Sequence, residues 1–127
     1  MAAAFNHTIV WCSNQGASAT FLAEMLGRPA PTRFGHFDVV ALDNGVSLDF
    51  ADVEGSIRPQ HYAFLISEAD FDAVLGRIKT RGLDYWADPR GGRPGEINRN
   101  DGGRGVYFRD PDGHYLEVIT RPYGSGD

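Results

Sequence analysis

Cysteine is nearly absent from this sequence, and so are long apolar runs and any excess of positive charge. The one cysteine, Cys12, excludes an intramolecular disulfide and a zinc cluster built from thiolates. No apolar run approaches the roughly 20 residues that cross a bilayer, so no membrane partner is expected. The net charge of −5 leaves no general basic surface, which argues against nucleic acid as a partner. The first residues lack a secretory signal pattern, and cytoplasmic localisation is therefore expected.

The composition that remains is that of an ordinary globular protein, with 42% hydrophobic and 23% charged residues in 127 positions. This length is most simply one domain, residues 1–127, with a sizeable buried core. A helix is predicted over 17–28, with Gly27 as its stop, and a second over 68–82, capped by Ser67 and ended by Gly82. The strand candidates are 5–12, 33–43, 45–52, 58–67, 85–89, 105–110 and 114–122.

The order of these elements repeats, and two pairs of segments align. "NHTIVWCS" matches "QHYAFLIS", which pairs His7 with His61, and "NGVSLDF" matches "DGHYLEV", which pairs Asp49 with Glu117. The offsets are 61 − 7 = 54 and 117 − 49 = 68, and the difference of 14 residues falls in a glycine-rich loop of the second half. The sequence thus predicts one βαβββ module over 5–54, a second over 58–121, and a loose tail over 122–127.

Polar side chains on these strands suggest a metal site. Strand alternation places His7 and His61 at equivalent points of the two modules, and Glu117 on the inner face of the last strand. If the modules pair, two imidazoles and a carboxylate meet in one cleft, a set suited to Fe, Mn, Zn, Ni or Co. Taken singly, each residue is more often an ordinary polar strand residue or a solvated acid. The predicted fold is therefore α+β, two paired βαβββ modules forming a curved mixed sheet around a metal-binding cleft.

These features resemble the vicinal oxygen chelate superfamily, which includes glyoxalase I, fosfomycin-resistance enzymes, extradiol dioxygenases and bleomycin-binding proteins. The resemblance covers residues 5 to 121 and rests on the paired modules, the two histidines and the terminal "YFRDPDGHYLEV". It implies one divalent metal ion held by His7, His61 and Glu117. It also implies a small-molecule substrate that chelates the ion through two neighbouring oxygens.

The terminal stretch is similar to the pattern that ends extradiol dioxygenases, including Tyr107, which would donate a hydrogen bond to substrate. That pattern also has a histidine where this chain has Asn98-Arg99-Asn100. An amide does not shuttle protons at neutral pH as an imidazole does. Proton-transfer chemistry of the isomerase or lyase type is therefore favoured over ring cleavage.

Further residues are candidates for the substrate pocket. Asp49 stands where glyoxalase I has a glutamate, and it would act as a base, as a ligand, or as a partner that orients a histidine. Arg99 and Arg104 suit a carboxylate or phosphate on the substrate, although a solvated loop explains them equally well. Trp11 and Phe50 would form an aromatic wall, and core packing is the alternative for each.

The preferred interpretation is a divalent-metal-dependent enzyme, catalysing proton transfer with Asp49 and Tyr107 and working as a homodimer. The alternatives are an extradiol-type dioxygenase and a metal-free drug-binding protein of the bleomycin-resistance kind. Modules of this type pair either within one chain or between two chains, and the sequence leaves both arrangements open.

Overall fold

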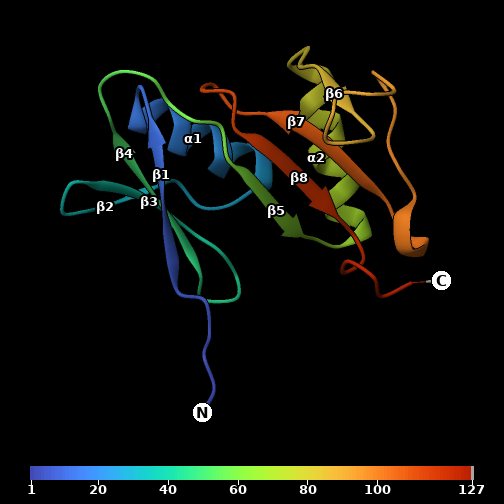
Figure 1. Ribbon diagram of the computed structural model, residues 1–127, viewed down its shortest axis with the longest axis horizontal. Helices are drawn as coiled ribbons and strands as arrows, with labels where there is room; N and C mark the ends of the chain where they lie inside the picture. Colours follow the sequence, from blue (N-terminus) through green and yellow to red (C-terminus); the bar gives the residue numbers. More distant parts are fainter. Residues whose placement is uncertain (127) are drawn as a thin grey trace. The chain divides into compact units, whose positions relative to one another are not determined.

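The computed structural model describes residues 1–126, which divide into two compact units with their boundary between Arg58 and Pro59. Each unit contains an α-helix and an open four-stranded mixed sheet (Figure 1). The two βαβββ modules predicted from the sequence are confirmed, and the fold class is α+β. Within residues 1–126, neither helix is long and apolar enough to cross a membrane.

In the first unit the strands lie in the order β1-β4-β3-β2. Strand β1 runs parallel to β4, and the remaining neighbours are antiparallel. The elements are β1 (His7–Cys12), α1 (Gln15–Leu26), β2 (Thr32–Phe34), β3 (Phe37–Ala41) and β4 (Ser47–Asp52).

The second unit repeats this arrangement with the order β5-β8-β7-β6. Strand β5 is parallel to β8, while β7 is antiparallel to both β8 and β6. The elements are β5 (His61–Leu65), α2 (Glu68–Thr80), β6 (Tyr85–Trp86), the short 3₁₀ helix η1 (Asn100–Gly102), β7 (Gly105–Arg109) and β8 (Tyr115–Ile119).

The register of the parallel pairs shows how closely the two units correspond. In the first unit, the β1 residue opposite Asp49 lies two positions after His7. In the second unit, the β5 residue opposite Glu117 lies two positions after His61. Equivalent histidines and acids therefore occupy equivalent places in the two sheets, as the sequence alignment of the repeats predicts.

The helix ends follow from local capping. Helix α1 begins at Gln15, two residues before its predicted start, because the side chain of Asn14 accepts a hydrogen bond from the backbone N–H of Ala17 at 3.1 Å. It ends at Gly27, whose φ of 66° lies in the left-handed region that glycine adopts without steric cost. Helix α2 begins after Ser67, whose hydroxyl accepts from Asp70 N–H at 3.1 Å, as predicted.

One face of each histidine-bearing strand is buried and the other is exposed. In β1, Val10 and Cys12 are buried, whereas Trp11 is 48% exposed. In β5, Phe64 is buried and Leu65 is 60% exposed. Strand alternation places the histidines on the exposed faces. The buried faces form the cores with the apolar side chains of the helices, among them Leu22, Met25, Phe71, Val74 and Ile78.

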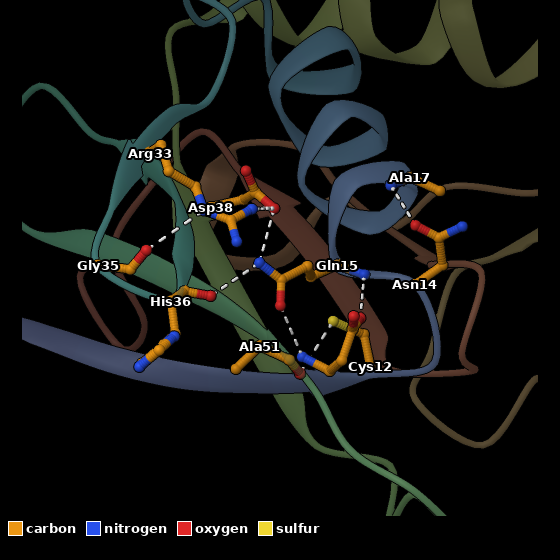
Figure 2. A network of polar contacts seen from close by, with 10 residues as sticks. Cys12, Asn14, Gln15, Ala17, Arg33, Gly35, His36, Asp38 and Ala51 are labelled. Carbon is orange, nitrogen blue, oxygen red and sulfur yellow. Dashed lines mark hydrogen bonds and ion pairs between the residues drawn. The ribbon is translucent and has the colours of Figure 1, made fainter.

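Gln15 joins the start of α1 to the sheet of the first unit (Figure 2). Its backbone N–H donates to the carboxylate of Asp52 at 2.6 Å, and its side-chain oxygen accepts from Asp52 N–H at 2.9 Å. Its side-chain amide donates to the carbonyl oxygen of His36 at 2.9 Å and to Oδ2 of Asp38 at 2.8 Å. One side chain thus connects the helix to both the β2–β3 turn and the end of β4.

We expect Gln15→Ala to destabilise the protein by about 1–2 kcal/mol, because three hydrogen bonds of the amide side chain are lost at once. Urea unfolding followed by circular dichroism measures this change. Gln60→Ala is the matched control, since Gln60 is exposed and the same atoms are removed. Equal unfolding midpoints for the two variants would show that the Gln15 contacts contribute nothing to stability.

Candidate metal and substrate site

Glu117 is a buried acid in the middle of β8, with an exposed fraction of only 1%. Its oxygen Oε1 lies 2.9 Å from Nε2 of His61 on the neighbouring strand β5. Burying an ionised carboxylate is costly unless hydrogen bonds or opposite charge compensate for lost water. The His61 ring supplies one such contact, and its own side chain remains 41% exposed. The pair therefore joins a buried carboxylate to a partly exposed imidazole.

The His61–Glu117 pair fits two neighbouring ligands of a divalent ion. Metal bonds to imidazole nitrogen and carboxylate oxygen are about 2.0–2.2 Å long, so two ligands at right angles lie about 3 Å apart. The observed separation of 2.9 Å matches this requirement. Imidazole combined with carboxylate suits iron, manganese, zinc, nickel or cobalt. Among residues 1–126 no group of three His, Cys, Asp or Glu side chains is assembled that could hold a metal ion.

Tyr107 lies directly across from Glu117 in the antiparallel pair β7–β8 and is 4% exposed. Its ring packs edge-on against His61, with ring centres 5.7 Å apart. Burial raises the pKa of the Tyr107 phenol well above its usual value, and hydrogen bonds to Tyr123 and Glu117 raise this pKa further. The phenol therefore stays protonated at neutral pH and is a hydrogen-bond donor rather than a base.

His7 and Asp49 occupy the equivalent places in the first unit but do not form the equivalent contact. Nδ1 of His7 lies 2.6 Å from the side-chain oxygen of Asn6. A proton on Nδ1 would complete that hydrogen bond and leave Nε2 available as a ligand. Asp49 is 8% exposed and accepts a hydrogen bond from the hydroxyl of Ser47 at 2.8 Å. The first unit therefore has a histidine beside Asn6 and an acid that is hydrogen-bonded to Ser47. The metal and catalytic roles predicted for His7 and Asp49 stay predictions.

The two arginines predicted to bind substrate have different surroundings. The guanidinium of Arg104 contacts the carboxylates of Glu68 at 2.7 Å and Asp72 at 2.8 Å, and it lies over the ring of Phe71 at 4.5 Å. The side chain of Arg104 is thus held against α2 by residues of that helix. Arg99 is exposed and immediately precedes η1. Substrate binding by either arginine stays a prediction.

The two residues of the predicted aromatic wall also differ. Trp11 lies on the exposed face of β1, the face that carries His7. Phe50 is 2% exposed and follows Asp49 in β4, so the two side chains point to opposite faces of the sheet. Phe50 is therefore a core residue of the first unit, and we leave it out of the proposed pocket. Trp11 remains a candidate.

Asn98, which stands in the region where the extradiol pattern has its histidine, has a structural function. The residue is 3% exposed, and its side-chain amide donates to the carbonyl oxygen of Ala87 at 2.8 Å. Its side-chain oxygen accepts from the N–H of Asn100 at 3.2 Å. Its backbone pairs with that of Gly105 in both directions, at 2.9 and 3.0 Å. Asn98 therefore fixes the long loop to the start of β7.

The turn before β8 positions the beginning of β5. The carboxylate of Asp110 accepts the N–H groups of Asp112 at 3.0 Å and of His114 at 2.9 Å, while burial raises the Asp110 pKa. Nδ1 of the buried His114 accepts the N–H of Gln60 at 2.9 Å, immediately before His61. His114 therefore has a structural role, and through the backbone of Gln60 it helps to hold His61 in place.

Tyr123 is a residue of this region that sequence reasoning missed. Its hydroxyl lies 3.3 Å from that of Tyr107 and 3.4 Å from Oε1 of Glu117. The one signal in the sequence is an aromatic residue in a tail that is otherwise short and glycine-rich. Such a signal is weak, because nothing in the spacing of Tyr123 relates it to Glu117.

Comparison with known proteins identifies the family. Residues 4–118 match the sequence model of the Glyoxalase/Bleomycin resistance protein/Dioxygenase superfamily. The chain belongs to this superfamily. The match covers the two histidines, the acid of β8 and nearly all of both modules, so the predicted resemblance is confirmed.

Relatives within the superfamily include transferases and oxidases. Glutathione transferase FosA of Serratia marcescens is 30% identical over 124 residues, covering 93% of this chain and 81% of the relative. Metallothiol transferase FosB of Shouchella clausii (strain KSM-K16) is 32% identical over 123 residues, covering 91% of this chain and 78% of the relative.

Two solved structures are more similar. Oxidase ChaP-H1 is 62% identical, with a TM-score of 0.95 and coverage of 97% of this chain and 99% of that chain. Oxidase ChaP-H2 is 59% identical, with a TM-score of 0.97 and complete coverage of both chains. The fold of this superfamily member is therefore shared with proteins that are named oxidases.

The Glu68–Arg104 contact beside this region gives a prediction about pH. A hydrogen bond from Thr120, followed by the one from Arg104, lowers the pKa of Glu68 below its usual value. A carboxyl whose pKa is lower in the folded state stabilises the protein above its unfolded pKa of about 4.3. This contribution is lost as the pH falls through the lower folded value.

Glu68→Gln should therefore melt at a lower temperature than the wild type at pH 7, and the difference between the two Tm values should shrink as the pH falls below about 4. Thermal unfolding followed by circular dichroism between pH 3 and 7 checks this expectation. Glu96→Gln, at an exposed position in the loop, is the control. A Tm difference that stays constant across this range would contradict the assigned contact.

Proposed function

We propose that this protein is a divalent-metal-dependent oxidase that acts on a small molecule with two adjacent oxygen atoms. His7, His61 and Glu117 would hold the ion. The observation that carries the proposal is the contact between a buried carboxylate and a half-exposed imidazole, in a chain about 60% identical over its length to two oxidases. When bound, the ion would act as a Lewis acid and, if it is iron, as the centre that exchanges electrons.

Other roles in substrate binding and proton transfer are assigned to individual residues of the chain. His61 and Glu117 bind the ion, and the protonated phenol of Tyr107 donates a hydrogen bond to a substrate oxygen. Asp49 accepts a proton from the substrate, and the Ser47 hydroxyl keeps its carboxylate in place. Trp11 contributes an apolar surface for a flat substrate.

Oxidation takes precedence over the isomerase or lyase chemistry that the sequence alone favours. That preference rests on the lack of a histidine at 98–100. In the structure Asn98 is a structural residue of this stretch, because its side-chain amide anchors the loop. The oxidases are about twice as similar in sequence as the two transferases, which makes their chemistry the closer guide. Proton transfer to Asp49 is one step of the proposed oxidation, whereas in an isomerase or lyase proton transfer would be the overall reaction.

The proposal is first tested by metal analysis of purified protein. We expect His61→Ala and Glu117→Gln each to weaken metal binding by at least about tenfold, because even residues that only orient metal ligands contribute this much. The controls are His36→Ala and Glu54→Gln, which make the same changes at exposed positions. Equal metal content in all five proteins would refute the ligand assignment.

Oxygen consumption separates the oxidase from an isomerase or lyase and from a metal-free binding protein. With iron bound, the protein should consume oxygen in the presence of catechol or another vicinal diol or hydroxyketone, and Tyr107→Phe should slow this reaction. Tyr85→Phe, outside the site, is the control. Tight binding of an aromatic compound that EDTA does not affect, without oxygen uptake, would favour the metal-free binding protein instead.

We also propose that the protein works as a homodimer whose sites combine His7 of one subunit with His61 and Glu117 of the other. The exposed apolar side chains on the histidine-bearing strands, Trp11 and Leu65, support this proposal, since apolar surface of this kind favours association.

A mixture of two inactive variants tests the shared site. His7→Ala and His61→Ala homodimers should each bind no metal tightly. After unfolding and refolding together, each mixed dimer should regain one of its two sites, because one subunit supplies His7 and the other supplies His61 and Glu117. Metal analysis of the separated mixed dimer measures this. Failure of any mixed dimer to regain metal would place all three ligands within one chain.

A further inference from the structure

The segment after β8 is folded against η1 rather than extended into solvent. The backbone N–H groups of Gly124 and Gly126 donate to the two carboxylate oxygens of Asp101, at 3.2 and 3.3 Å. Both the N–H and the hydroxyl of Ser125 donate to the carbonyl oxygen of Pro122, at 3.1 and 2.6 Å. These contacts fix residues 122–126 as a turn, which we call the tail.

Asp101 has a conformation that suits this contact. Its φ is 58°, in the left-handed region that few residues other than glycine, asparagine and aspartate adopt. A side chain built on Gly126 would collide with the backbone carbonyl group of Asp101, so the two backbones are in close contact. Asp101 therefore holds the tail through its carboxylate and through direct backbone packing.

The tail brings Tyr123 to the carboxylate of Glu117. The Tyr123 residue is 69% exposed, yet its hydroxyl lies 3.4 Å from Oε1 of Glu117, which is the oxygen that also contacts His61. The same hydroxyl lies 3.3 Å from that of the buried Tyr107. Core packing does not explain a tyrosine whose ring faces solvent while its hydroxyl reaches a buried acid.

We infer that Tyr123 is a positioning residue of the proposed metal site, held there by Asp101. Its hydroxyl donates to Glu117 and limits the rotation of the carboxylate, so that Oε1 keeps its place beside His61. Because the ring lies on the solvent side, the tail also limits the access of chelators to Glu117. The inference rests on the proposed function, in which Glu117 is a metal ligand.

The attachment of the tail is tested without any metal, by hydrogen exchange. Asp101→Asn keeps a residue that tolerates positive φ but replaces one acceptor oxygen by an amino group. Gly126→Ala introduces the colliding side chain. In both variants the amides of Gly124 and Gly126 should exchange at least about fivefold faster, as expected for the loss of one hydrogen bond.

Asp84→Asn, at an exposed position before β6, is the control and should leave the exchange of these amides unchanged. The amides of β7 and β8 should remain protected in every variant, which shows that the unit is still folded. Unchanged exchange at Gly124 and Gly126 in both Asp101→Asn and Gly126→Ala would refute the role of Asp101, whatever the protein binds.

The role of Tyr123 is tested with Co²⁺ alone, whose visible absorption reports its ligands. Tyr123→Phe removes only the hydroxyl and should weaken Co²⁺ binding by about tenfold, the usual effect of losing a group that orients a metal ligand. The variant should remain folded, with only the small fall in Tm that the loss of the hydroxyl's hydrogen bonds causes. Asp101→Asn should weaken binding in the same direction and accelerate the transfer of Co²⁺ to EDTA.

Tyr85→Phe is the matched control, because it removes a tyrosine hydroxyl from β6 without touching the tail. Wild-type affinity in Tyr123→Phe, with normal Co²⁺ binding by the wild type, would refute the role of Tyr123 alone. Failure of the wild type itself to bind Co²⁺ would instead refute the proposed function, and the role of Tyr123 with it.

Discussion

The burial of the Glu117 carboxylate is the constraint on which the rest of the candidate site depends. An acid taken out of water must find hydrogen bonds inside the protein, and each missing one costs free energy. Glu117 finds them on separate parts of the chain, at His61 on β5 and at Tyr123 in the tail, whose hydroxyl lies beside that of Tyr107 on β7. The parallel and antiparallel pairing of β8 with its neighbours thus positions the chemical groups as well as the backbone.

Asp49, the equivalent of Glu117 in the first unit, shows which features the two repeats share and which differ. Asp49 is buried like Glu117, but its side chain is one methylene shorter and accepts from Ser47 rather than from a histidine. His7 in turn contacts Asn6. The two halves therefore share a backbone plan while differing in the contacts of their acids. This difference is what allows one acid to act as a ligand and the other to act on substrate protons in the proposed enzyme.

Much of this organisation was predictable because it follows from local patterns. The α2 cap at Ser67, the end of α1 at Gly27 and the equivalence of His7 with His61 are all encoded by residues close in sequence or repeated along it. Sequence patterns did not reveal that Asn14 lets α1 begin earlier, nor that Arg104 is held by α2. The second point depends on contacts between residues far apart in the chain.

The sequence by itself determined the βαβββ repeat and the family resemblance, and it made His61 and Glu117 candidates, because strand alternation and repeated motifs can be read without coordinates. Only the tertiary structure decided that His61 contacts Glu117, that Phe50 lies in a core, and that Tyr123 reaches the buried acid. The physical reason is that hydrogen bonds depend on atoms being within about 3.5 Å. For residues on different strands or in a tail, chain folding sets that distance, and no spacing in the sequence expresses it.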